Sequence, residues 1–364
     1  MLAGCGSDND GASVIGNTTS DTTGDLTVGT TGGSAGGATG DPAGGTTGDS
    51  AGGATGDSAG ATTGDSAGGT AGTTGDSTDG TAEAGTITLP GGVQAGPTLG
   101  SAAEAAGLLE GAINANPALT LVTAVDHQAN AANVGLELRP TRVTIFGNPN
   151  LGTPLMQVNP LAGLDLPQKM LTWTDAEGQS NIAYNSAGYL SGRYGLESEQ
   201  TTIDTIDNAL AGLASTAAGQ TVTPTEVTAP SINEGIRIIQ SANDFDTTYE
   251  LLRSTIDSAG ALTIVSEVDH SANAANVGLT LRPTRLIIFG NPNLGTPLMQ
   301  SGQSIAIDLP QKMLVVQKEN GISYVAFNDP EYLASRHGIT DQTDTINTIA
   351  GALNGLAATA TTAQ

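Results

Sequence analysis

The chain has 364 residues, with 11 Lys and Arg against 36 Asp and Glu, which gives a formal net charge of -25. So strong an excess of negative charge repels phosphate backbones and argues against nucleic acid as a partner. The single Cys excludes an intramolecular disulfide framework and any Cys-rich zinc or iron–sulfur site, and no apolar run reaches the roughly 18 residues expected of a membrane-spanning helix.

The chain begins with Met-Leu-Ala-Gly-Cys (1–5), and Leu-Ala-Gly-Cys resembles the lipobox of bacterial lipoproteins. The charged and apolar segments that usually precede a lipobox are missing here. The resemblance implies a lipid on Cys5 that anchors the chain in the bacterial cell envelope, outside the cytoplasm. Gly6 after this Cys favours the outer membrane or the periplasm. The alternative is a cytosolic chain with a disordered tail.

Residues 6–85 consist almost entirely of Gly, Ser, Thr, Ala and Asp and contain no Lys or Arg. Such a composition cannot bury enough apolar surface to offset the entropy lost on ordering, so it predicts a disordered linker. Gly-Asp pairs recur at short intervals, as in a calcium-binding β-roll, but the large apolar residue that such a repeat requires is absent. We therefore expect a flexible tether between the anchor and the folded part.

The rest of the chain is an internal duplication. Val125–Gln157 and Val268–Gln300 are identical at 29 of 33 positions, with an offset of 143 residues. The duplication predicts a first module over residues 86–218, a linker over 219–230 and a second module over 231–360, each large enough for a core of its own.

Turn and cap signals place the elements of the second module. Asn320-Gly321 is a favoured two-residue hairpin turn, Pro330 suits the first position of a helix, and Asp244 or Asp246 can cap one. In chain order we expect a strand at 235–240, a helix to about 258, a strand at 262–270, a loop, a strand at 283–290, a turn at 291–293, a short helix at 294–300, strands at 313–318 and 322–328, a helix at 330–336 and a helix through 346–356. This order predicts an α+β fold in which helices cover one face of a mainly antiparallel sheet.

Four motifs recur in both modules: H-x3-A-x3-G-L-x-L-R-P-T-R, F-G-N-P-x2-G-T-P-L-M, D-L-P-x-K and Y-L-x2-R-x-G. Together they resemble the bacterial and archaeal family called domain of unknown function 302 (DUF302), over nearly all of residues 86–360. The resemblance implies a fold similar to that of the TATA-binding protein, a curved antiparallel sheet backed by helices. It implies no established activity, and such a fold does not by itself imply DNA binding.

Polar residues that both modules retain are the candidates for ligand contact: His127, Arg139, Arg142, Asn148, Lys169, His270, Arg282, Arg285, Asn291 and Lys312. We expect His127, Arg142, Asn148 and Lys169 to line one concavity. The alternatives are a structural, hydrogen-bonded His, Arg side chains that form internal ion pairs, and a tight turn at Asn148 without a ligand.

Imidazole and thioether groups together can bind copper or haem iron, so His127 with Met156 and His270 with Met299 form an alternative metal site. Met in such helices is more often a core residue, and we predict no cofactor. A hydrolase or isomerase with His127 as base is a further alternative. On a strand, Asp126 would point away from His127, and no nucleophile is placed by spacing, so we assign no catalytic residue.

The sequence thus predicts a membrane-tethered, extracytoplasmic protein whose two modules bind a small ligand or a protein partner without catalysis. The two modules could also pair with each other and form one composite site.

Overall fold

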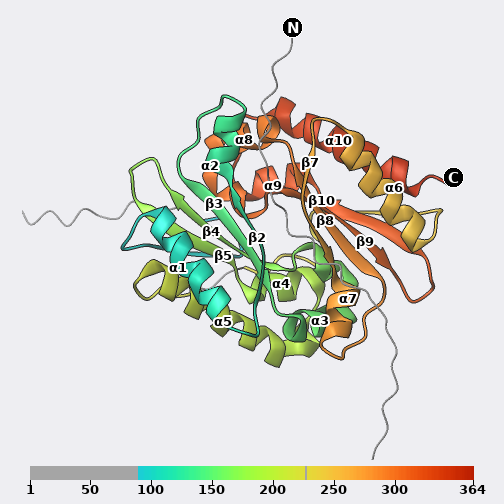
Figure 1. The fold of residues 1–364 in the computed structure, drawn as a ribbon, viewed down its shortest axis with the longest axis horizontal. Coiled ribbons are helices and arrows are strands. Elements are labelled where there is room, and N and C mark those ends of the chain that lie inside the picture. Colours follow the sequence, from blue (N-terminus) through green and yellow to red (C-terminus); the bar gives the residue numbers. More distant parts are fainter. Residues whose placement is uncertain (1–88, 226–227) are drawn as a thin grey trace, which may run out of the picture. The chain divides into compact units, whose positions relative to one another are not determined.

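The computed structural model describes residues 89–225 and 228–364, which make up both modules (Figure 1). The predicted lipobox and the linker over 6–85 lie outside the described residues. Both modules belong to one compact unit. Within the described ranges, no helix combines the length and the apolar character needed to cross a bilayer.

The first module (turquoise to yellow-green in Figure 1) contains five strands and the helices between them. Its elements are β1 Val93–Pro97, α1 Ala102–Ala115, β2 Thr120–Asp126, α2 His127–Asn133, β3 Thr141–Gly147, α3 Pro149–Val158, the 3₁₀ helix η1 Pro160–Leu164, β4 Gln168–Thr174, β5 Ser180–Asn185, α4 Ala187–Tyr194, the 3₁₀ helix η2 Glu197–Glu199 and α5 Gln200–Ala218. The strands form one antiparallel sheet in the order β1-β5-β4-β3-β2.

The second module repeats this plan in the order β6-β10-β9-β8-β7, again with every neighbouring pair antiparallel. Its elements are β6 Ile236–Gln240, α6 Phe245–Ser258, β7 Thr263–Asp269, α7 His270–Asn276, β8 Thr284–Gly290, α8 Pro292–Ser301, the 3₁₀ helix η3 Gln303–Ile307, β9 Gln311–Gln317, β10 Ser323–Asn328, α9 Pro330–Arg336 and α10 Thr343–Thr361. The predicted α+β class with antiparallel sheets is confirmed.

One prediction for the second module is wrong. The segment after β7 was expected to be a loop, and the strand was expected to include His270. Instead β7 ends at Asp269, whose carboxylate accepts a hydrogen bond from the Ala272 N–H and begins helix α7. Asp126 caps α2 in the same way. Each His is therefore the first residue of a short helix, because an Asp cap and an Ala-rich stretch favour a helical turn there.

Both faces of each sheet are buried. Met170 of β4 packs toward the helices of its own module, whereas its neighbour Leu171 and Trp173 share a core with Ile305 and Ile307 of η3. Correspondingly, residues of η1 contact β8 and β9. The 3₁₀ helix of each module thus covers the second face of the other module's sheet, and the apolar side chains buried there join the two modules.

Candidate functional site

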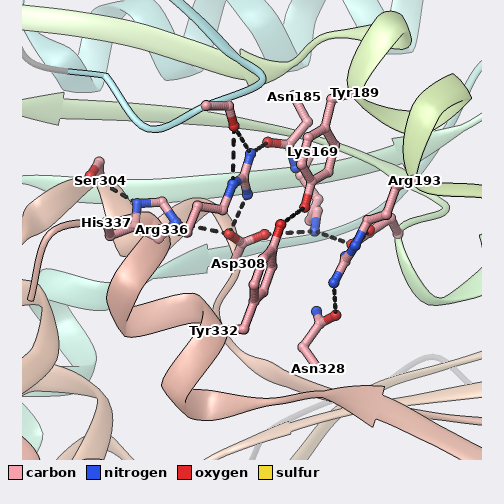
Figure 2. A network of polar contacts seen from close by, with 12 residues as sticks. Lys169, Asn185, Tyr189, Arg193, Ser304, Asp308, Asn328, Tyr332, Arg336 and His337 are labelled. Atoms are coloured by element: carbon pink, nitrogen blue, oxygen red, sulfur yellow. Dashed lines mark hydrogen bonds and ion pairs between the residues drawn. The ribbon is translucent and has the colours of Figure 1, made fainter. Parts of the chain in front are cut away.

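Six buried charged residues meet where the two modules join. Figure 2 labels Lys169, Arg193, Asp308 and Arg336 among them. In each module an Asp follows the 3₁₀ helix, a Lys lies at the start of the next strand, and an Arg lies at the end of the helix after the hairpin. We call this set the charge cluster; it consists of Asp165, Lys169, Arg193, Asp308, Lys312 and Arg336. Their side chains are at most 4% exposed.

The contacts of the charge cluster cross between the modules. Arg193 donates to Asp165 of its own module at 2.5 Å and to Asn328 of the other module at 2.9 Å. Lys169 Nζ lies 3.6 Å from an Asp165 oxygen and 3.8 Å from an Asp308 oxygen. The equivalent contacts in the other direction are those of Arg336 with Asp308 and Asn185. The cluster therefore ties the two modules together through charge-assisted hydrogen bonds.

The pKa values in the charge cluster follow from burial and from an excess of cations over carboxylates. Burial alone raises the pKa of Asp165, but Arg193, Lys169 and Lys312 outweigh it and hold that pKa well below its usual range. Burial, together with the neighbouring Lys169, lowers the pKa of Lys312 to about 7. Lys312 is thus poised to lose its proton near neutral pH, which reduces the positive charge that the fold must bury.

Two equivalent apolar pockets lie apart from the charge cluster, and none of its six residues lines either of them. The first pocket, of about 120 Å³, is formed mainly by first-module residues such as Leu151, Met156 and Leu210. The second pocket, of about 190 Å³, is formed mainly by the corresponding second-module residues. Each pocket also takes a His from the other module: His270 lines the first pocket and His127 the second.

The two His side chains differ in their hydrogen bonds. His270 Nε2 lies 3.1 Å from the carbonyl oxygen of Gly163, which can only accept, so this imidazole carries its proton on Nε2. His127 Nε2 is buried and has no partner among the described residues. The position equivalent to Gly163 is Ala306, and a Cβ added at Gly163 would lie 3.3 Å from His270 Nε2. By the same spacing, the methyl group of Ala306 would crowd this hydrogen bond in the second pocket, where His127 Nε2 has no partner among the described residues.

Burial lowers the pKa of both His127 and His270 to about 4, so both imidazoles are neutral at pH 7. Further polar atoms in the pockets also lack partners in the described part of the chain: Thr153 Oγ1 and Gln168 Nε2 in the first, and Thr296 Oγ1 in the second. A buried polar group without a hydrogen bond costs about 1 to 3 kcal/mol. A ligand with a polar group would remove that cost.

Comparison with known proteins assigns the fold to a family. The family model described as "Domain of unknown function DUF302" matches residues 97–213 and 238–356, together more than half of the chain. The chain belongs to the DUF302 family. Each match covers one module, so the protein is a tandem DUF302 repeat.

Curated relatives include the fluoride-specific ion channel FluC 1 of Brucella suis biovar 1 and FluC 2 of Brucella melitensis biotype 1, each 39% identical over 108 residues, or 30% of this chain. The alignments cover 42% and 40% of those proteins, so the chain spans about two fifths of their length. A crystal structure of the uncharacterized conserved protein DUF302 from Bacillus stearothermophilus aligns with a TM-score of 0.32 and 15% identity, covering 34% of this chain and 96% of that chain.

The structure separates the four residues expected to line one concavity in the first DUF302 module. His127 lines the second pocket and Asn148 the first, while Lys169 belongs to the charge cluster and Arg142 pairs with Glu110. The side chain of Asn148, like that of its equivalent Asn291 in the second pocket, also caps the helix that follows it. The expectation fails because each DUF302 module contributes its His to the other module's pocket.

Arg142, Arg282 and Arg285 form ion pairs within the protein, as the ion-pair alternative predicts, whereas Arg139 donates to a neutral side chain. Their partners are Gln303 for Arg139, Glu110 for Arg142, Glu319 for Arg282, and Asp269 and Asp246 for Arg285. None of these arginines lines either apolar pocket. Their polar contacts are made with other parts of the protein, outside both apolar pockets.

The predicted metal pairs require a correction. Met156 shares the first pocket with His270, and Met299 shares the second with His127, so the expected pairing within one DUF302 module does not occur. Among residues 89–225 and 228–364, no group of three or more His, Cys, Asp and Glu side chains is arranged to hold a metal ion. The Asp126 carboxylate accepts from the Ala129 N–H and serves as a helix cap.

Sequence reasoning did not propose the Asp and Arg residues of the charge cluster as site residues. The sequence did mark these residues, because Asp165 and Arg193 recur in the second DUF302 module as Asp308 and Arg336 at the same offset. The presence of the same residue in both modules does not, however, distinguish a residue that holds the modules together from one that binds a ligand. Thr153 and Gln168 carried the same signal, and their orphaned polar atoms become evident only from burial.

Proposed function

We propose that the tandem DUF302 protein binds a small, largely apolar molecule with one uncharged polar end in each of its two pockets, without converting it. The observation that supports this most is the matched pair of apolar pockets, each completed by a neutral His from the other module. Pockets with apolar walls and a few convergent polar groups are the usual form of small-ligand sites.

The polar atoms of the pockets favour an uncharged hydroxyl or carbonyl group on the ligand. In the second pocket, His127 Nε2 and Thr296 Oγ1 lack partners. A neutral imidazole nitrogen can accept or donate one hydrogen bond, depending on its tautomer, and a hydroxyl can do both. A charged ligand group would have to lose its hydration without a buried counter-ion in the pocket lining.

Calorimetric titration of the full chain with 1-hexanol tests the proposal. We expect two sites in the chain. Leu151→Trp, which fills the first pocket, and Leu294→Trp, which fills the second, should each remove one site, because both side chains line their pockets and are only partly buried. The double variant should bind no hexanol. Unchanged binding by the folded double variant, or no binding by the parent chain, would contradict the proposal.

A matched substitution tests the role of the imidazole. Ala306→Gly gives the second pocket the residue found in the first, so that His127 can bond to the carbonyl of residue 306. His127 would then no longer be free to bond to hexanol. Losing that hydrogen bond, which contributes about 1 kcal/mol, should weaken hexanol binding in the second pocket about fivefold. Hexane, which has no polar group, should bind the variant and the parent chain equally.

Copper or haem iron remains the alternative, supported by the His and Met that each pocket brings together. Metal analysis and the visible spectrum of the natively purified chain distinguish the two proposals. Stoichiometric copper, or a haem absorption band that is lost in His127→Asn/His270→Asn, would favour the metal site over the apolar ligand.

We further propose that the protein is lipid-anchored through Cys5 in the bacterial cell envelope, facing away from the cytoplasm. The support is the Leu-Ala-Gly-Cys sequence followed by a long acidic segment without Lys or Arg. Mass spectrometry of the native protein from the membrane fraction should show an acylated peptide beginning at Cys5. Cys5→Ala should release the protein from the membrane fraction. An unmodified Cys5 in native protein from the soluble fraction would refute the anchor.

A further inference from the structure

A third cavity, of about 250 Å³, lies in the first module between α1 and the sheet. Apart from Glu110, the α1 residues that line it have small side chains: Ala102, Ala103, Ala106 and Gly107. The remaining lining includes Arg142 and Thr172 from two neighbouring strands. This cavity is distinct from both apolar pockets and has none of their lining residues.

The second module fills the same place with two aromatic rings. At the offset of 143 residues, Phe245 and Tyr249 of α6 correspond to Ala102 and Ala106 of α1. They are only 5% and 6% exposed. Their ring centroids lie 5.5 Å and 5.1 Å from the guanidinium carbon of Arg285, which is the equivalent of Arg142. One fold thus accommodates two rings against this Arg in one copy and leaves the space open in the other.

The open space also presents polar groups to an occupant. Arg142 donates to Glu110 at 2.9 Å, and Asp126 lines the cavity beside them. Thr172 is 1% exposed, and its Oγ1 has no hydrogen-bond partner among the described residues. The second module has the apolar Val315 at this position. The cavity therefore offers a cation for a ring face and hydrogen-bonding oxygens for a hydroxyl group.

We propose that this third cavity of the first module binds one small phenolic molecule, with its ring against Arg142 and its hydroxyl bonded to Thr172 or a neighbouring carboxylate. A cavity of about 150 Å³ suffices to hold benzene, so the space accommodates one substituted ring. The second module supports the choice of ligand, since there the hydroxyl of Tyr249 donates to the carboxylate of Glu267 while its ring faces Arg285. This site is independent of the function proposed for the two apolar pockets.

NMR titration of the full chain with p-cresol tests the proposal, and toluene is the matched probe without a hydroxyl group. We expect saturable p-cresol binding with the largest shifts at residues around Arg142. Binding should persist in Leu151→Trp/Leu294→Trp, in which both apolar pockets are blocked. Ala102→Phe/Ala106→Tyr copies the second module into the first and should abolish this binding while raising the melting temperature. Unchanged p-cresol affinity in this folded variant would overturn the proposal.

Thr172→Val gives the first module the residue of the second and tests the hydroxyl contact with little change in volume. Losing one hydrogen bond should weaken p-cresol binding about fivefold and leave toluene binding unchanged. If toluene and p-cresol bind the parent chain equally well, the site does not recognise phenols. If neither probe shifts residues around Arg142, the cavity is not a ligand site.

Discussion

Asp165→Asn is expected to lower the free energy of unfolding by about 3 to 5 kcal/mol, because removing one partner of a buried ion pair leaves the other charge uncompensated. Asp165 bonds to Arg193 at 2.5 Å and lies within 4 Å of both Lys169 and Lys312. Asn keeps the shape of the side chain and removes its charge, so the charge cluster retains its four basic residues but only one carboxylate. Urea unfolding of the full chain at pH 7 measures the loss.

A matched control separates the effect of breaking a buried ion pair from the effect of breaking an exposed one. Glu319→Gln removes the partner of Arg282, but Glu319 is 85% exposed and water compensates for the lost charge. Its unfolding midpoint should stay close to that of the parent chain. Asp165→Asn/Lys169→Met also removes one buried cation and should recover part of the lost stability. The account of the charge cluster fails if Asp165→Asn is no more destabilising than Glu319→Gln.

Acidification from pH 7 to pH 4 is expected to destabilise the protein through His127 and His270. Burial lowers the pKa of each from 6.5 to about 4, so between these values the unfolded chain binds more protons than the folded chain. The stability that the two neutral His contribute is therefore fully present above about pH 6.5 and is lost as the pH falls toward 4. A shift of this size corresponds to roughly 3 kcal/mol for each His.

Urea unfolding between pH 7 and pH 4 measures this dependence. The carboxylates of Asp165 and Asp308, whose pKa values lie below the ordinary 3.8, stay charged in the folded chain throughout this range, so the stability that they contribute is lost mainly below pH 4. His127→Gln should flatten the pH dependence, and His127→Gln/His270→Gln should flatten it further. Some dependence should persist, because burial also lowers the pKa of His337 despite its bond to Asp308. Equal pH profiles for the parent chain and the double variant would show that these His residues do not titrate in this way.

Local signals in the sequence predicted most elements of the fold because each depends on a few adjacent residues. Pro330 and Asp244 mark where α9 and α6 begin, and Asn320-Gly321 lies between β9 and β10. The helix at His270–Asn276 was missed because it is short and depends on a single Asp cap. A strand that ends one residue earlier than expected changes which way the next side chain points.

The candidate site was only partly predictable for a different reason. His127, Asn148 and Lys169 were identified because the same residue stands at the equivalent position of each module. This comparison could not separate the pocket residues from the charge cluster. Spacing along the chain describes neighbours within one module. It contains no information on which module supplies a His to which pocket, so the pairs His127 with Met156 and His270 with Met299 were wrong as pocket partners.

The sequence by itself thus determined the duplication, the DUF302 family, the α+β class and the set of paired polar residues. Only the tertiary structure decided what those residues do, because a sheet has two faces and the helices of one module cover only one of them. The other face of each sheet is buried by the 3₁₀ helix of the other module. That packing places the charge cluster between the modules and completes each pocket with a His from the other module.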